Sequence, residues 1–237
     1  MTIEKFLFLA HTQTILSAVV AILCFVLFKS RSIDVRLIGF IFLTSFLANI
    51  ISLLLIRLGM LRAFINIPPV IYLCVSLCLY SYLYSLNLKV KKPNWPLFVT
   101  VGFILFSVTN FLFIQKTTPN SYTYLLHSGI LIVYSILYFF VLMRDLPTVY
   151  VHHLPMFWFN SGVLIFHAGV FFLFSFTAYL VNIQKNNLLF YWSFHHILSI
   201  AEHCIMIIGL YYDFKFGQTK VTRSPAKPWP NNFQKES

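Results

Sequence analysis

Charged side chains are scarce in this sequence of 237 residues, of which Asp, Glu, Lys and Arg together make up 10%. Asp and Glu number only 6. A soluble domain carries about 25% charged residues, because charged side chains cover its surface. The composition therefore excludes a soluble domain of any size, whether a kinase, an appended enzyme or a ligand-binding module.

Several common catalytic motifs are also missing. The chain has no GxxxxGK[ST], GxGxxG, HExxH or GxSxG pattern, so the usual signatures of phosphate, dinucleotide, zinc-protease and serine-hydrolase sites are absent. No Lys lies near the middle of the last apolar stretch, which excludes a retinal Schiff base. The four cysteines all fall inside apolar stretches, where we expect small buried side chains and no disulfide.

Apolar residues make up 59% of the chain, and the mean hydropathy is +0.81. About 20 apolar residues are needed to cross about 30 Å of hydrocarbon as a helix. Seven stretches meet this requirement: Phe6–Phe28, Leu37–Gly59, Ile67–Leu88, Trp95–Ile114, Tyr122–Met143, Met156–Val181 and Leu188–Tyr212. We therefore predict an all-α polytopic membrane protein: a seven-helix bundle over residues 1–212, then a basic, proline-containing tail over 213–237.

The basic residues predict the orientation, because short cytoplasmic loops retain Lys and Arg. Of the 17 Lys and Arg, 12 fall on the side of the C-terminus and 5 on the other. We expect the N-terminus outside and the C-terminus in the cytoplasm. This distribution also explains the net charge of +11 without nucleic acid. The tail is expected to contact anionic lipid, or alternatively a cytoplasmic protein, through Lys215, Lys220, Arg223 and Lys227.

Ionisable residues within spans are costly and mark function by default. Glu202 is the only carboxylate deep in a predicted span. Helical spacing places it on one stripe with His195 and Ser199, and an overlapping stripe carries His196, Ser199 and His203. Both stripes are expected to face the bundle interior, since lipid offers these groups no partner.

Counting inward from the span ends places polar residues in two tiers. The midplane tier contains Asn49, His167, Glu202 and His203. The tier toward the outside contains His11, Gln13, Asn110, His127, His195 and His196. We expect His11, Asn110, His127, His195 and His196 of this tier to form a ligand pocket together with Ser199. Four interpretations stay open: an interhelical hydrogen-bond network, a pocket that senses a ligand or protons, a metal site, and a transport path. Gly and Pro lie mainly at span ends, which argues against transport through broken helices.

Two resemblances extend this interpretation. The segments Leu154–Gly162 (LPMFWFNSG) and Phe194–Leu198 (FHHIL) resemble uncharacterised seven-span proteins of similar length from Bacteroidota-type bacteria. That resemblance implies an inner-membrane protein that works with a separately encoded signalling protein such as a histidine kinase. The span count and the intramembrane histidines are similar to those of the alkaline ceramidase and adiponectin-receptor hydrolases.

The hydrolase resemblance implies a zinc ion held by His167, His195 and His203, with Glu202 as general base. The last predicted span has no HxxxH pair, and no predicted span contains Asp. We predict a receptor-like protein, without a cofactor, that senses a small or lipophilic signal and passes it to a cytoplasmic protein. The alternatives are a metal-dependent intramembrane hydrolase of a lipid amide or ester, and a structural subunit of a membrane complex.

The predicted orientation can be tested with reporters at both ends of the chain. A reporter fused after Ser237 is expected to read cytoplasmic, and a tag ahead of Met1 is expected to be accessible from outside, because 12 of the 17 basic residues lie on the C-terminal side. A periplasmic signal from the C-terminal fusion would contradict the seven-span topology.

Overall fold

The computed structural model describes residues 3–26, 31–88, 95–115, 121–145, 150–176 and 188–216, except the side chains of 3, 62, 63 and 188–191. Its regular elements are all helical: α1 (Ile3–Phe25), α2 (Ile33–Arg57), α3 (Arg62–Ile65), α4 (Ile67–Leu88), α5 (Trp95–Thr109), a π-helical turn η2 (Asn110–Ile114), α6 (Ser121–Asp145), a 3₁₀ turn η3 (Val151–His153), α7 (Pro155–Ser175) and α9 (Leu188–Phe216). Seven helical segments are long and apolar enough to cross a membrane. The prediction of an all-α, seven-helix integral membrane protein is confirmed.

Local sequence signals explain where α2 begins and ends. The Ser32 side chain caps the helix by accepting a hydrogen bond from the Val35 backbone N–H at 3.4 Å, and Asp34 lies in the positive first turn. Gly59 follows the last turn with φ of 66°, a left-handed conformation that glycine adopts without strain. The polar residues Ser32 and Asp34 explain why α2 starts at Ile33, ahead of the predicted Leu37.

The other boundaries differ from the predictions by a few residues. Helix α1 begins at Ile3, and α9 continues past the predicted end at Tyr212 as far as Phe216. The predicted ends at Phe28 and Val181, and the tail over 217–237 with its expected lipid contacts, lie outside the described residues.

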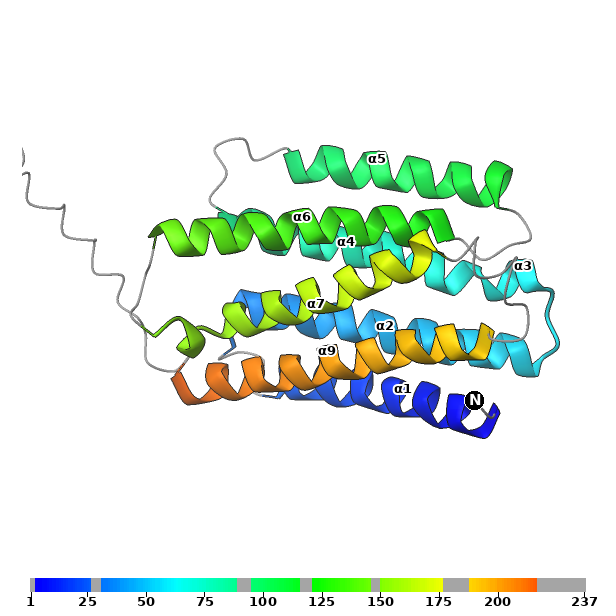
Figure 1. Ribbon diagram of the computed structural model, residues 1–237, viewed down its shortest axis with the longest axis horizontal. Helices are drawn as coiled ribbons and strands as arrows, with labels where there is room; N and C mark the ends of the chain where they lie inside the picture. Colours follow the sequence, from blue (N-terminus) through cyan, green and yellow to red (C-terminus); the bar gives the residue numbers. More distant parts are fainter. Residues whose placement is uncertain are drawn as a thin grey trace, which may run out of the picture.

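Six of the spanning helices close a ring. Helix α1 packs on α2, α2 on α4, α4 on α6, α6 on α7, α7 on α9, and α9 packs back on α1. Helix α5 lies outside this ring against α4 and α6, at the edge of the bundle (Figure 1). The start of α1 and the end of α9 lie at opposite ends of the bundle, as an odd number of spans requires (Figure 1).

We name the two ends of the bundle by their residues. The basic end carries Arg31, Arg36, Arg144 and Lys215, and is the end predicted to face the cytoplasm. The opposite end carries the short helix α3 and is called the α3 end (Figure 1).

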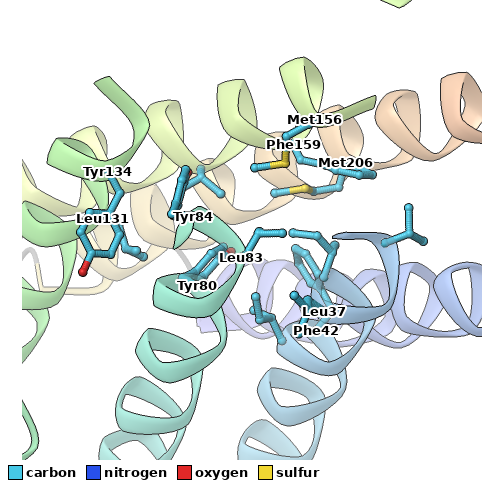
Figure 2. Close-up of a cluster of buried hydrophobic side chains, with 14 of the residues drawn as sticks. Leu37, Phe42, Tyr80, Leu83, Tyr84, Leu131, Tyr134, Met156, Phe159 and Met206 are labelled. Atoms are coloured by element: carbon cyan, nitrogen blue, oxygen red, sulfur yellow. The ribbon is translucent and has the colours of Figure 1, made fainter. Parts of the chain in front are cut away.

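The half of the bundle toward the basic end is a packed core. Leu83 of α4, Phe159 of α7 and Met206 and Leu210 of α9 are all buried there, and Figure 2 draws several of these side chains where the helices meet. Lipid is as apolar as these residues, so burial alone does not hold the helices together. Close packing and interhelical hydrogen bonds must do so.

Tyr84 forms the most connected of these polar contacts. Its hydroxyl donates to Asn160 Oδ1 at 2.7 Å and lies 2.9 Å from Ser135 Oγ, which can donate to it. Asn160 Nδ2 in turn donates to the Ser135 carbonyl at 3.1 Å. The three residues are fully buried and belong to α4, α6 and α7. The cluster therefore joins three helices at one point where lipid could not satisfy the polar groups.

Helices α7 and α9 approach each other closely at glycines. A Cβ on Gly209 would lie 2.5 Å from Phe159 Cε1 and 3.2 Å from Trp158 Cβ, and a Cβ on Gly169 would overlap Leu198. Glycine at such positions lets two backbones come into contact in a membrane. Side chains of each helix therefore pack directly over a glycine of the other.

This close approach predicts a difference between two glycines. Gly209→Ala should lower the free energy of unfolding by about 1–3 kcal/mol, because the new methyl group overlaps the Phe159 ring. Gly102→Ala on α5 should be neutral or slightly stabilising, since nothing lies within 4 Å of the added atom. Unfolding in mixed micelles with increasing SDS measures the free energy of unfolding of both variants. An equal loss of stability in the two would contradict the close packing at Gly209.

Candidate functional site

A polar cavity of about 90 Å³ lies inside the helix ring, in the half toward the α3 end. Each helix of the ring contributes side chains to its wall, and α5 contributes none. The predicted polar residues that line it are Gln13, Asn49, His127, His167, His195, Ser199, Glu202 and His203. The structure therefore brings the midplane tier and part of the outer tier together in one cavity.

His203 is held by both of its ring nitrogens. Nδ1 lies against the Ser199 carbonyl, which can only accept, so Nδ1 carries the proton. In the neutral ring, Nε2 then accepts from the Ser17 hydroxyl on α1 at 2.8 Å. His203 thus joins α9 to α1 and has no lone pair left for a ligand or metal.

His127 of α6 and His167 of α7 lie next to each other in the cavity wall. Their ring centroids are 5.2 Å apart. His127 Nε2 lies 3.0 Å from Ser76 Oγ, and His167 Nδ1 lies 3.3 Å from Ser128 Oγ. Each ring keeps its other nitrogen outside these bonds, and a neutral imidazole offers a donor on one nitrogen and an acceptor on the other.

Glu202 and His195 have polar groups that find no hydrogen-bond partner in the described part of the chain. Glu202 is 5% exposed and lines the cavity, yet no described residue forms a hydrogen bond with its carboxylate. His195 Nδ1 is buried and also lacks a hydrogen-bond partner within the described part of the chain. A buried carboxylate without a partner is costly and calls for a compensating proton or cation.

Three residues of the predicted pocket lie elsewhere. His11 is exposed on the outer surface of α1. Asn110 is buried at the start of η2, outside the ring, where its Nδ2 donates to Thr123 Oγ1 at 3.0 Å. His196 packs beside the cavity, with Nδ1 against Gln13 Oε1. Their depth along the spans was predicted from sequence, but the direction in which each helix faces was not.

The cavity does not present the expected zinc site. Among the described residues, no three His, Cys, Asp or Glu side chains are grouped so that they could hold a metal ion. His203, one of the three predicted ligands, uses both nitrogens in hydrogen bonds to Ser17 and Ser199. The donor set of His167, His195 and His203 therefore does not fit a zinc ion in this structure.

Two tyrosines and three serines of the site were not predicted from the sequence. Tyr72 and Tyr80 of α4 line the cavity, and three serines bind the buried histidines: Ser17, Ser76 and Ser128. The chain contains 13 Tyr, so a tyrosine in a span carries no distinguishing signal. A serine that faces a histidine on another helix is recognisable only once the helices are placed.

The basic end holds a second polar cluster. Arg31 Nη1 lies 2.6 Å from Asp213 Oδ2, with both side chains at 10% exposure or less. The ring of His153 stacks on Phe216 with centroids 4.5 Å apart, and Trp158 stacks on Tyr212 at 5.8 Å. Partial removal from water, together with the nearby charges of His152 and Lys215, lowers the pKa of His153 below its ordinary value. The stacked position therefore favours the neutral form of the His153 ring.

Two carboxylates on α9 are expected to respond oppositely to neutralisation. Asp213→Asn leaves Arg31 buried without its counter-ion and should lower the free energy of unfolding by up to about 3 kcal/mol. Glu202→Gln and Glu202→Leu remove a charge that has no partner and should leave stability unchanged or raise it by roughly 1 kcal/mol. SDS titration of the three variants measures the difference. A large loss in Glu202→Gln would show that the carboxylate has a structural partner.

Comparison of the chain with protein-family models, curated proteins and solved structures finds no match. The resemblances to uncharacterised seven-span proteins and to seven-span hydrolases therefore stay predictions. The geometry of the cavity is the basis on which a function can be proposed.

Proposed function

We propose that this chain is a receptor-like protein of a bacterial inner membrane that binds a small, positively charged ligand in the ring cavity. It passes the binding event to a cytoplasmic signalling protein at the basic end. The observation that carries this proposal is the Glu202 carboxylate, buried in a polar cavity without a hydrogen-bond partner among the described residues.

The lining of the cavity favours a cation. Glu202 supplies the negative charge, and the unpartnered Nδ1 of His195 can accept a hydrogen bond. Aromatic rings of Tyr72, Tyr80 and Phe166 complete the wall, and ring faces attract cations. An ammonium group would offer N–H donors to both unsatisfied groups, whereas an anion would meet an uncompensated carboxylate.

The size of the cavity limits the part of a ligand that it can hold. Pockets for drug-sized molecules measure about 300–1,000 Å³, and this one measures about 90 Å³. Toward the basic end the helices close over the packed core around Tyr84 and Phe159. A cavity in one half of the bundle above a packed core favours binding and sensing over transport.

Helices α7 and α9 connect the ring cavity to the basic end of the bundle. Both carry cavity residues, His167 on α7 and Glu202 on α9. The same two helices carry the stacked Trp158 and Tyr212 at the basic end. Because side chains of each helix pack directly over a glycine of the other, a ligand that shifts one helix is expected to shift both.

The alternatives predicted from sequence gain less support. A metal-dependent hydrolase needs a ligand set, and the predicted one does not assemble among the described residues. A purely structural subunit would gain nothing from an unpaired buried carboxylate, which a hydrophobic residue could replace at no cost in stability.

The proposal predicts that a small ammonium ion stabilises the protein and changes its basic end. Butylammonium at about 100 times its Kd should raise the free energy of unfolding by about 2.7 kcal/mol. Hydrogen–deuterium exchange over 150–158 should change on binding, because this segment stacks on the end of α9. Both measurements use the purified full chain in nanodiscs.

The matched control is a second carboxylate. Glu202→Gln should abolish both responses, whereas Glu4→Gln, at an exposed position on α1, should keep them. A response to butylammonium that survives Glu202→Gln would rule out the carboxylate as the binding group. Stabilisation without any change over 150–158 would contradict the signalling part of the proposal.

A further inference from the structure

An open apolar groove of about 390 Å³ lies on the outer surface of the bundle beside the α3 end. Helices α2, α3 and α4 form it, and its wall is apolar except for Thr44 and the Tyr72 hydroxyl. Leu47, Ile51 and Ile71 in this wall are 46–57% exposed, at span positions where the surroundings are hydrocarbon. A molecule that fills this groove must therefore come from the bilayer.

The groove and the polar cavity share a wall. Ala48 and Tyr72 line both of them. Ser45 of α2, Tyr72 of α4 and Glu202 of α9 all line the cavity, so the Tyr72 side chain lies between the groove and the space that contains the carboxylate. One small side chain and one tyrosine ring therefore belong both to the lipid-facing groove and to the cavity.

The two spaces suit the two parts of one amphiphile. The cavity, at about 90 Å³, has room for a charged head group but no chain, and the groove is apolar and more than four times larger. A carboxylate head group would be repelled by Glu202, and a hydroxyl would leave its charge uncompensated. A primary ammonium group would compensate the charge and donate to the imidazoles as well.

We propose that the ligand is a long-chain primary amine that enters sideways from the bilayer between α2 and α4. Its chain lies in the groove, and its ammonium group lies beside Glu202 after the Tyr72 ring turns aside. This inference rests on the cation site of the proposed function and names the class of molecule that the site takes.

A second groove provides an internal reference. It measures about 740 Å³, lies between α5 and α6, is equally apolar, and shares no lining residue with the cavity. Chains that merely accumulate on apolar surfaces should favour this larger groove. A chain anchored by its head group should favour the smaller groove beside Tyr72.

The test is photo-crosslinking of the full chain in nanodiscs with a long-chain amine that carries a diazirine in its chain. Labelled peptides should map to 47–51 of α2 and 71–75 of α4. Hexadecylamine should compete, and hexadecanol and hexadecanoate should not. Glu202→Gln should remove the labelling at this groove.

A substitution on the lipid-facing surface tests the lateral entrance without disturbing the core. Ile71→Trp places an indole in the groove at a residue that is 57% exposed, and should weaken the apparent affinity at least about tenfold, equivalent to about 1.4 kcal/mol. Ile136→Trp on α6, 55% exposed and outside both grooves, should leave it unchanged.

The outcomes separate this inference from the proposed function. Labelling confined to the α5–α6 groove, or equal competition by hexadecanol, would overturn the amine assignment. Absence of labelling beside Tyr72, with the Glu202-dependent response to butylammonium intact, would overturn the lateral entry and leave the cation site standing. If the wild-type protein shows neither labelling beside Tyr72 nor a response to butylammonium, both this inference and the proposed function would be overturned.

Discussion

Inside the hydrocarbon of a membrane a polar side chain finds no water, so another part of the protein must satisfy it. This constraint shapes the bundle more than hydrophobic burial does, because lipid covers apolar surface as well as a neighbouring helix would. Tyr84, Ser135 and Asn160 meet at one buried point and fix three helices relative to one another. The bond between Ser17 and His203 closes the ring between α1 and α9 in the same way.

Glu202 departs from this rule. Glu202 is buried in the cavity, and no hydrogen bond from the described residues reaches its carboxylate. On the same helix, Asp213 is paired with Arg31 at 2.6 Å. Proteins accept a loss of stability at residues that serve function, and the contrast between these two carboxylates is the basis for the cation site proposed in the cavity.

The two halves of the bundle differ in how tightly they are packed. The half toward the α3 end is polar and contains free volume around His167 and Glu202, whereas the half toward the basic end is filled by residues such as Phe159 and Met206. A packed interior deforms as a whole, since it has few voids to absorb a shift. A displacement at the cavity is therefore expected to reach the stacked Trp158 and Tyr212 through α7 and α9.

The seven spans could be predicted from the sequence, because the length of an apolar run that crosses the bilayer depends on the thickness of the hydrocarbon. The inward direction of Glu202, Ser199 and His203 could be predicted as well, because helical spacing and the cost of placing polar groups in lipid are local properties. Which helices are neighbours follows only from the folded arrangement. In that arrangement α5 lies outside the ring, which separates Asn110 from the pocket, and His203 forms a hydrogen bond with Ser17 on α1. Apolar helices carry little information about their partners, since lipid and protein are equally good surroundings for their surfaces.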